Sequence, residues 1–393
     1  MVPGTHTHER IPVWRDERAL KVAAQVISAA IIIGILYWAI ANFFEASRQR
    51  GMSLSYGFLD APAGFPIKET YIPYTPTMSF ARAFLAGLVN TLVVSAVGIV
   101  FATLLGFFVA LGRLSSNWLF SRISLAFIEF HRNIPLLVLL VIWYFGVFNR
   151  FPQVKDSYVL PGPIYLNQRG LYLIWPRFTE TTNIFLLALL AGFILGIMTW
   201  LVLRRIRMET GKPTYYGGVS LAAMFIVVVI GWLLSGSAPL ELEVPVLTGF
   251  NFRGGLSLSP EFASLLFGLT TYTAAFIAEV IRAGIQAVQR GQVEAARAIG
   301  LKGDQLLRFI VMPQALRVII PPLISQYLNL AKNSSLALYI GYQEVFAIGK
   351  VAINQAGRAV PVFLMVMATY LLMSLLTSAV LNFYNRRIQF VEK

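Results

Sequence analysis

The sequence predicts an all-α integral membrane protein with about eight transmembrane helices, and three observations support this fold class. Hydrophobic residues make up 57% of the 393 positions and charged residues only 13%, whereas a soluble domain usually carries about 25% charged residues. Several apolar runs exceed the roughly 18 to 20 residues that cross a bilayer as a helix. Backbone groups in hydrocarbon must be paired within their own segment, so runs of this length are expected to be helical.

Eight apolar segments are predicted to cross the membrane. The first follows a polar leader at 1–19 and is too long for the core of a signal peptide, so we expect it to be retained. The seventh contains Pro321 and Pro322, which we expect to break its helix. The predicted spans are Leu20–Phe44, Phe84–Leu111, Ile134–Phe148, Ile184–Leu203, Val219–Leu234, Phe262–Ile285, Ile310–Leu330 and Pro361–Phe383.

The distribution of basic residues predicts the orientation of these spans. With the N-terminus inside, the inside segments carry Lys and Arg at about twice the density of the outside segments, as the positive-inside rule requires. The run Arg204, Arg205 and Arg207 leads the inside group. An even number of spans then places both termini in the cytoplasm.

Composition excludes several classes of function. The net charge is +14, but the basic residues flank apolar spans and do not form the dense stripe of a nucleic-acid-binding surface. Cysteine is absent, so disulfides, thiolate metal sites and cysteine nucleophiles are excluded. The histidines are His6, His8 and His131, and they lack metal-ligand spacing. We therefore expect no metal and no nucleic acid on this chain.

The long outside loops, 45–83 and 149–183, are rich in Pro, Gly, Tyr and Trp. Such loops suit a lid or a docking surface for an external partner, and a plain solvated connector is an equally good interpretation.

The predicted cytoplasmic loop at 288–313 has a pattern that a simple connector would lack. A helix-forming block from Glu294 to Ile299 is closed by Gly300, which suits the left-handed position after a helix. The alanines in this block leave little side-chain bulk, so the backbone of another protein could approach closely. The motif residues are Glu294, Ala295, Ala296, Arg297, Gly300 and Pro313.

The spacing Glu-Ala-Ala, three residues, Gly, nine residues, Ile-x-Met-Pro closely resembles the EAA loop of binding-protein-dependent ABC importer permeases. Met312 stands where that family usually has Leu. Further resemblance to the polar amino-acid permeases is carried by Val89-Asn90-Thr91-Leu92, by the stretch from Glu129 to Leu137, by Ala278 to Ile285, and by Lys332 to Leu336.

The resemblance covers about 84–150 and 262–385, and it implies a type I importer permease core of five helices. The segment 20–44 is then an extra span, and 151–261 is an insert with two spans, giving a permease domain over 84–384. The enlarged form resembles a membrane subunit of the general L-amino-acid importers of Gram-negative bacteria.

This resemblance implies a role and a set of partners. The 288–313 loop would be the coupling helix that seats on a separate cytoplasmic ATP-binding cassette subunit. That subunit would use ATP and Mg, because this chain has no Gly-x4-Gly-Lys-Ser/Thr loop to hold phosphates. The resemblance also implies a periplasmic amino-acid-binding protein, a second permease subunit in a heterodimer, and a multi-pass location in the bacterial inner membrane.

Polar residues within or beside the spans are candidates for the solute pathway, since ionisable groups in a membrane are costly. Glu279 has Arg282 three residues on, so a helix-end ion pair is the alternative interpretation. For Lys332 the alternative is a snorkelling side chain on the outer surface. The candidates are Tyr272, Glu279, Gln326, Lys332, Asn333, Ser334 and Ser335.

Three other functions fit the sequence less well. An ion-coupled secondary transporter would need acidic or His relays within the spans and inverted repeats. An intramembrane enzyme would need a motif such as His-Glu-x-x-His or a Ser/His pair, which the spans lack. A membrane scaffold would leave the 288–313 spacing unexplained.

Overall fold

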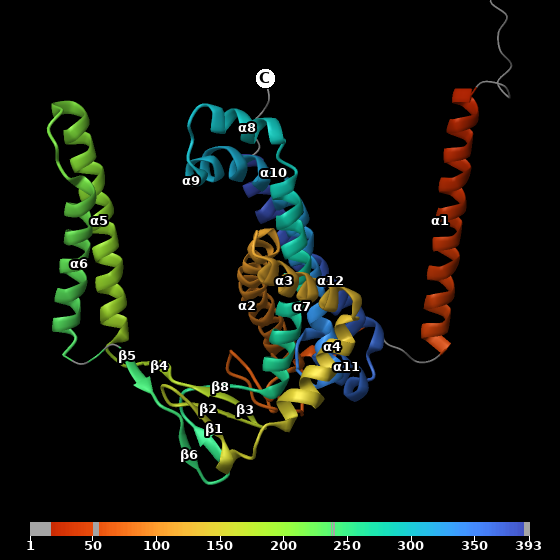
Figure 1. The fold of residues 1–393 in the computed structure, drawn as a ribbon. Coiled ribbons are helices and arrows are strands. Elements are labelled where there is room, and N and C mark those ends of the chain that lie inside the picture. The colour runs from red at the N-terminus through yellow and green to blue at the C-terminus, as the bar shows by residue number, and fades with distance from the viewer. Residues whose placement is uncertain (1–16, 50–54, 237, 239, 389–393) are drawn as a thin grey trace, which may run out of the picture.

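The computed structural model describes residues 17–49, 55–236, 238 and 240–388, and it is mostly helical (Figure 1). Within these residues, seven helical segments are long and apolar enough to cross a membrane. They confirm seven of the predicted spans. The helices are α1 (Glu17–Gln49), α2 (Phe80–Leu114), α5 (Thr182–Thr210), α6 (Tyr216–Leu234), α7 (Pro260–Gln286), α10 (Met312–Asn333) and α12 (Ala359–Ile388). Most of the predicted leader, 1–19, lies outside the described residues, as do His6 and His8.

The third predicted span is part of a bent pair. Helix α3 (Trp118–Asn133) is followed by α4 (Leu136–Val141), and α4 continues as a π turn and a 3₁₀ turn to Arg150. The helix axis bends by 105° between the two halves. Together the halves are apolar enough for an eighth span. The bend falls at Ile134, which is extended because a residue before proline avoids the helical region.

The two prolines of the seventh span do not break it, which corrects the sequence-based expectation. Pro321 and Pro322 lie inside α10, and the apolar segment runs from Gly303 to Ile340. Both prolines are exposed, so their rings lie on the outer surface of the helix. The change in geometry comes later, where α10 passes into a 3₁₀ segment, Ser334–Ile340. Membrane helices tolerate proline when neighbouring groups satisfy the freed backbone.

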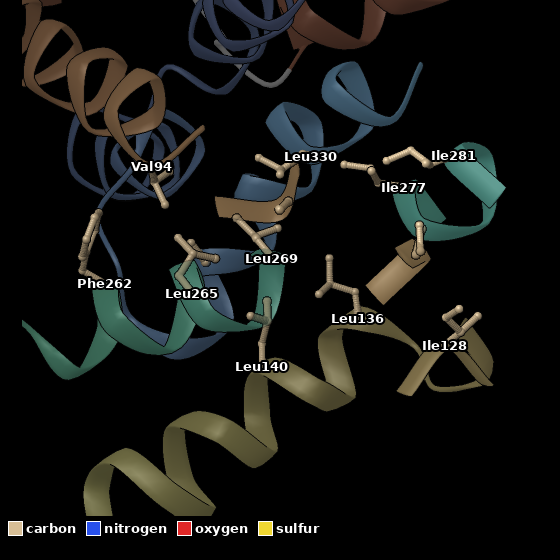
Figure 2. Packing of buried hydrophobic residues seen from close by; sticks show 14 of the residues in the cluster. Val94, Ile128, Leu136, Leu140, Phe262, Leu265, Leu269, Ile277, Ile281 and Leu330 are labelled. Carbon is tan, nitrogen blue, oxygen red and sulfur yellow. The ribbon is translucent and has the colours of Figure 1, made fainter. Parts of the chain in front are cut away.

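The helical core is built where α2, α7 and α10 pack together, with α3 and α4 on one side (Figures 1 and 2). Leu265, Leu269 and Ile277 of α7 are fully buried in this cluster. Glycine permits the closest approach of α2 to α7. A Cβ added at Gly106 would lie 2.7 Å from Ile277 Cγ2 and 2.9 Å from the Ala274 carbonyl oxygen.

The 149–183 loop and the 235–261 segment are not plain connectors, because they pair with each other. Strands β1 (Tyr158–Leu160), β2 (Ile164–Asn167), β3 (Gly170–Leu173) and β8 (Leu256–Leu258) form an antiparallel sheet in that order. Two-stranded ribbons are formed by β4 (Trp175–Phe178) with β5 (Leu240–Glu243) and by β6 (Val246–Thr248) with β7 (Asn251–Arg253). The α5–α6 hairpin rises from these strands, apart from the core (Figure 1).

Three short helices complete the chain. Helices α8 (Arg290–Ala298) and α9 (Gly303–Leu306) lie at the end of the helical array opposite the strands, and α11 (Val345–Ala356) packs beside α2 and α12 (Figure 1). The segment 331–360, between the seventh and eighth predicted spans, is therefore mostly helical and partly buried.

Candidate functional site

Helix α8 carries the sequence motif and ends in a Schellman motif. Gly300 adopts a φ of +83°, which confirms the left-handed position predicted for it. Its amide donates to the Arg297 carbonyl oxygen at 3.0 Å, and the amide of Leu301 donates to the Ala296 carbonyl oxygen at 3.1 Å. These two bonds satisfy carbonyl groups at the helix end. The direction in which the chain leaves α8 is thereby fixed.

The α8–α9 module has its own small hydrophobic core. Ala296, Leu306 and Val311 are buried together, and Leu301 packs against them. The predicted motif alanines therefore differ in role, because Ala296 faces inward while Ala295 is exposed. Glu294, Arg297 and Pro313 are exposed as well.

Large apolar side chains of this module are exposed, among exposed charged residues such as Glu294 and Arg297. Ile299 is 78% exposed and Phe309 is 59% exposed. The small Ala295 and Ala298 of α8 are exposed as well.

The structure does not gather the predicted solute-pathway residues into one site. Ser334 Oγ donates to the Ala331 carbonyl at 2.7 Å, and Ser335 Oγ donates to the Lys332 carbonyl at 2.8 Å. Both hydroxyls are thus bonded to their own helix. The Lys332 side chain is exposed, and Asn333 and Gln326 are half-buried.

Glu279 forms the ion pair that the sequence offered as its alternative interpretation. Arg282 Nη2 lies 2.7 Å from Glu279 Oε2, and Arg282 Nε contributes a second bond at 3.0 Å. The predicted pathway residue Tyr272 packs its ring against Phe276, with ring centroids 5.0 Å apart. These contacts explain Glu279 and Tyr272 structurally, and a role in solute passage stays a prediction.

Sequence reasoning missed a buried carboxylate at Glu344, whose side chain caps α11. It accepts the amides of Phe346 at 3.0 Å and Ala347 at 2.8 Å, and the hydroxyl of Tyr370 at 2.6 Å. The hydroxyl oxygen of Thr91, on α2, accepts the amide of Val345 at 3.1 Å. This cap ties α2, α11 and α12 together. An acidic residue within an otherwise apolar stretch was the available signal.

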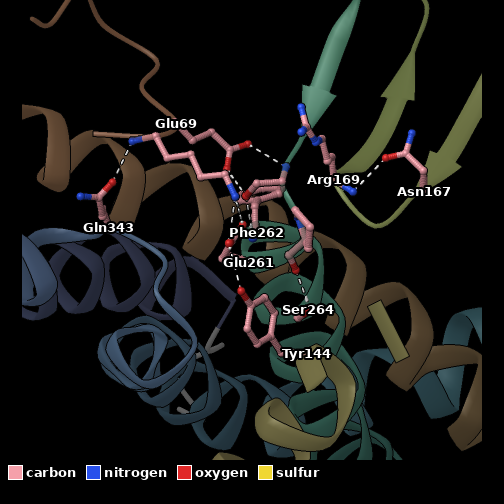
Figure 3. A network of polar contacts seen from close by, with 11 residues as sticks. Glu69, Tyr144, Asn167, Arg169, Glu261, Phe262, Ser264 and Gln343 are labelled. Atoms are coloured by element: carbon pink, nitrogen blue, oxygen red, sulfur yellow. Dashed lines mark hydrogen bonds and ion pairs between the residues drawn. The ribbon is translucent and has the colours of Figure 1, made fainter. Parts of the chain in front are cut away.

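A second polar network was also missed, at the start of α7 (Figure 3). Ser259 caps this helix by accepting the Phe262 amide at 3.1 Å, and its hydroxyl donates to Glu69 Oε2 at 2.6 Å. Lys68 Nζ bonds both carboxylate oxygens of Glu261, at 2.8 and 2.9 Å, and the Tyr144 hydroxyl donates to the same carboxylate at 3.1 Å. Burial raises the pKa of Glu69, against the lowering effect of its bond to Ser259. No sequence pattern joins these distant positions.

Comparison with known proteins places this architecture in a family. The model of binding-protein-dependent transport system inner membrane components matches residues 218–390. The putative amino-acid ABC transporter permease protein YhdX of Escherichia coli is 42% identical over 370 residues, which cover 94% of each chain. This chain belongs to the family of binding-protein-dependent ABC transporter permeases. The general L-amino acid transport system permease protein AapQ of Rhizobium johnstonii is 38% identical, over 96% of this chain and 94% of its own.

A solved structure described as an amino acid ABC transporter with histidines aligns at 21% identity and a TM-score of 0.48, over 78% of this chain and 95% of that one. As a permease of this family, the chain is a membrane component of a transport system and not an enzyme. The resemblance seen in the sequence is confirmed, and so is the multi-pass helical fold class.

Proposed function

We propose that this permease imports L-amino acids of broad specificity in a binding-protein-dependent ABC system. The observation that carries this proposal is similarity over nearly the whole chain to two permeases whose names specify amino-acid transport, one of them general for L-amino acids. The substrate class follows from those names. Ion-coupled secondary transport, the alternative, would leave the α8 motif without a use.

In this proposal the exposed face of α8 is the contact with a separate ATPase subunit that uses ATP and Mg. Glu294, Ala295, Ala296, Arg297 and Gly300 form or shape that contact, and Pro313 begins the span to which the module is anchored. Three features support it: the small exposed side chains, the fixed helix end and the exposed Ile299. Closure of the ATPase dimer would push α8 and reorient the core helices, giving alternating access. No covalent chemistry occurs on this chain.

We further propose the assembly and its place in the cell. The remaining components are a second permease subunit, forming a heterodimer, and a periplasmic amino-acid-binding protein. The chain lies in the bacterial inner membrane with both termini in the cytoplasm. Residues 84–384 then form the permease domain, with 20–44 as an added span and 151–261 as a two-span insert. The charge distribution supports this orientation.

Two measurements test the proposal together. The chain is co-expressed with candidate ATP-binding cassette subunits, purified, and examined for an ATPase that co-purifies with it. Uptake of a panel of radiolabelled L-amino acids is measured in a strain that lacks the chain and in the same strain with the chain restored. We expect ATP-dependent uptake of several amino acids. An ATPase that never co-purifies, or a panel that shows no restored uptake, would overturn the proposal.

A further inference from the structure

A polar cavity of about 680 Å³ lies between the strands and the start of α7. The strands and the start of α7 lie at the opposite end of the molecule from α8 and α9 (Figure 1). The cavity volume falls within the range of about 300 to 1,000 Å³ typical of small-molecule sites. The charged and amide side chains that line it are Lys68, Glu69, Asn149, Gln168, Arg169, Asn251 and Glu261.

Two of the four charges in this cavity neutralise each other. Lys68 Nζ lies 2.8 Å from Glu261 Oε2, and the Glu261 side chain is only 13% exposed. The charges of Lys68 and Glu261 are therefore compensated within the protein. Glu69 and Arg169 remain, one of each sign.

Glu69 is held in place by a neutral partner. Its carboxylate accepts the Ser259 hydroxyl at 2.6 Å and the Ser259 amide at 3.4 Å. The neighbouring Lys68 ammonium bonds Glu261 instead. Among the described residues, Glu69 forms no ion pair within 4.0 Å. Because a half-buried carboxylate lacks a compensating charge, binding of a ligand that brings a cation to it is favourable.

Arg169 belongs to a different segment, the turn between β2 and β3. Its backbone amide donates to Asn167 Oδ1 at 2.8 Å, and Asn167 is itself buried (Figure 3). The neighbouring Gln168 amide donates to the Pro152 carbonyl at 2.9 Å. The turn is therefore well anchored. In the part of the chain that the structure describes, the Arg169 guanidinium has no ion-pair partner, and its side chain is exposed to the cavity.

We propose that this cavity binds the zwitterionic backbone of a free α-amino acid, with Glu69 taking the ammonium group and Arg169 taking the carboxylate. The inference rests on the proposed function and adds a site outside the helical core. A planar guanidinium can bind a carboxylate through two parallel bonds. The unused volume and the amide side chains of Asn149 and Gln168 accommodate different amino-acid side chains, as a general importer requires.

The absence of cysteine in this chain permits a direct test. Ser257 lies on the cavity wall, whereas Thr248 is exposed on β6 and does not line the cavity. Single variants Ser257→Cys and Thr248→Cys of the chain, co-purified with its partners in nanodiscs, are treated with a maleimide reagent. The alkylation rate of this chain is measured against L-alanine, propionate and ethylamine, without binding protein or ATP.

We expect L-alanine to slow alkylation at position 257 and not at 248. Propionate and ethylamine, which each carry one charge only, should not protect at the same concentrations. Adding Arg169→Gln should raise the half-protecting concentration by about tenfold, the loss of one charge-assisted contact. The matched control is Arg253→Gln, because Arg253 is exposed on β7 outside the cavity lining. This variant should change the half-protecting concentration of L-alanine by less than about twofold.

Failure of the site and failure of the proposed function give different results. If L-alanine does not protect position 257, or if Arg169→Gln has no effect, while the unaltered complex still imports amino acids, then the site is wrong and the function stands. If protection occurs as described but ATP-dependent uptake is absent, the site stands and the proposed function is wrong.

Discussion

The backbone amide of Leu301 donates to the carbonyl oxygen of Ala296 across the end of α8, at 3.1 Å. The same two residues pack in the hydrophobic cluster beneath the helix. The hydrogen bond and the packing thus both fix the turn at the C-terminal end of α8. Gly300 makes this possible because it occupies a left-handed conformation that residues with a Cβ adopt at a cost of about 1–2 kcal/mol.

Replacing Gly300 by alanine should uncouple the permease without unfolding it. A Cβ at this position would meet no described atom within 4 Å, so the cost is backbone strain alone. If that strain disrupts the turn at the end of α8, association with the ATPase should weaken by about 5- to 30-fold. Pull-down of the ATPase and amino-acid uptake measure the effect.

Gly303→Ala is the matched control. Gly303 begins α9, has similar open space, and lies outside the group of positive-φ glycines. It should retain association and uptake. If the two variants showed the same ATPase association and uptake, the left-handed conformation at Gly300 would not matter for coupling.

Ala295 and Ala296 are adjacent, but their substitution should have different consequences. Ala295→Trp adds bulk on the exposed side of α8, so thermal stability should change by less than about 0.5 kcal/mol while ATPase association is lost. Ala296→Leu overfills the cluster around Leu306 and should destabilise the module by about 1–3 kcal/mol. Limited proteolysis of the 288–313 loop, compared with pull-down, separates the two effects. An Ala295→Trp variant that still binds the ATPase would show that the contact lies elsewhere.

Much of this fold was predictable because a membrane imposes simple rules. Helices of about 20 apolar residues, and the left-handed Gly300, follow from local chemistry alone. The effect of Pro321 and Pro322 was wrongly predicted, because neighbouring groups decide whether a membrane helix survives proline.

Long-range pairing was out of reach of the sequence. Strand β8 joins a sheet whose other strands lie before the α5–α6 hairpin, and no local pattern specifies such a partner. The contacts of Glu69 with Ser259 and of Thr91 with Val345 likewise join positions far apart in the chain. A polar cavity built from such contacts appears only when the chain is folded.

Gly106→Val should destabilise the helical core. The added side chain would have to enter space held by Ile277 and by the backbone of Ala274. Backbone cannot yield as a flexible side chain can, so we expect a loss of about 1–3 kcal/mol or more. Thermal unfolding of the detergent-solubilised protein, followed by size-exclusion chromatography, measures this loss. Gly34→Val in α1, where a Cβ meets no described atom within 4 Å, is the control and should leave the melting temperature unchanged.

Glu69 should make stability depend on pH. Burial raises its pKa above the ordinary value of 4.5, so the folded chain holds the carboxyl proton more tightly than the unfolded chain does. Its stabilising contribution is therefore complete below pH 4.5 and is lost as the pH rises through the raised pKa of the folded state. Glu69→Gln keeps an acceptor for Ser259 but cannot titrate. The stability of the unaltered chain, minus that of Glu69→Gln, should fall by at most about 1.4 kcal/mol per pH unit in this interval. Thermal unfolding of both proteins from pH 4 upward measures the difference, and a constant difference would show that Glu69 titrates as it does in the unfolded chain.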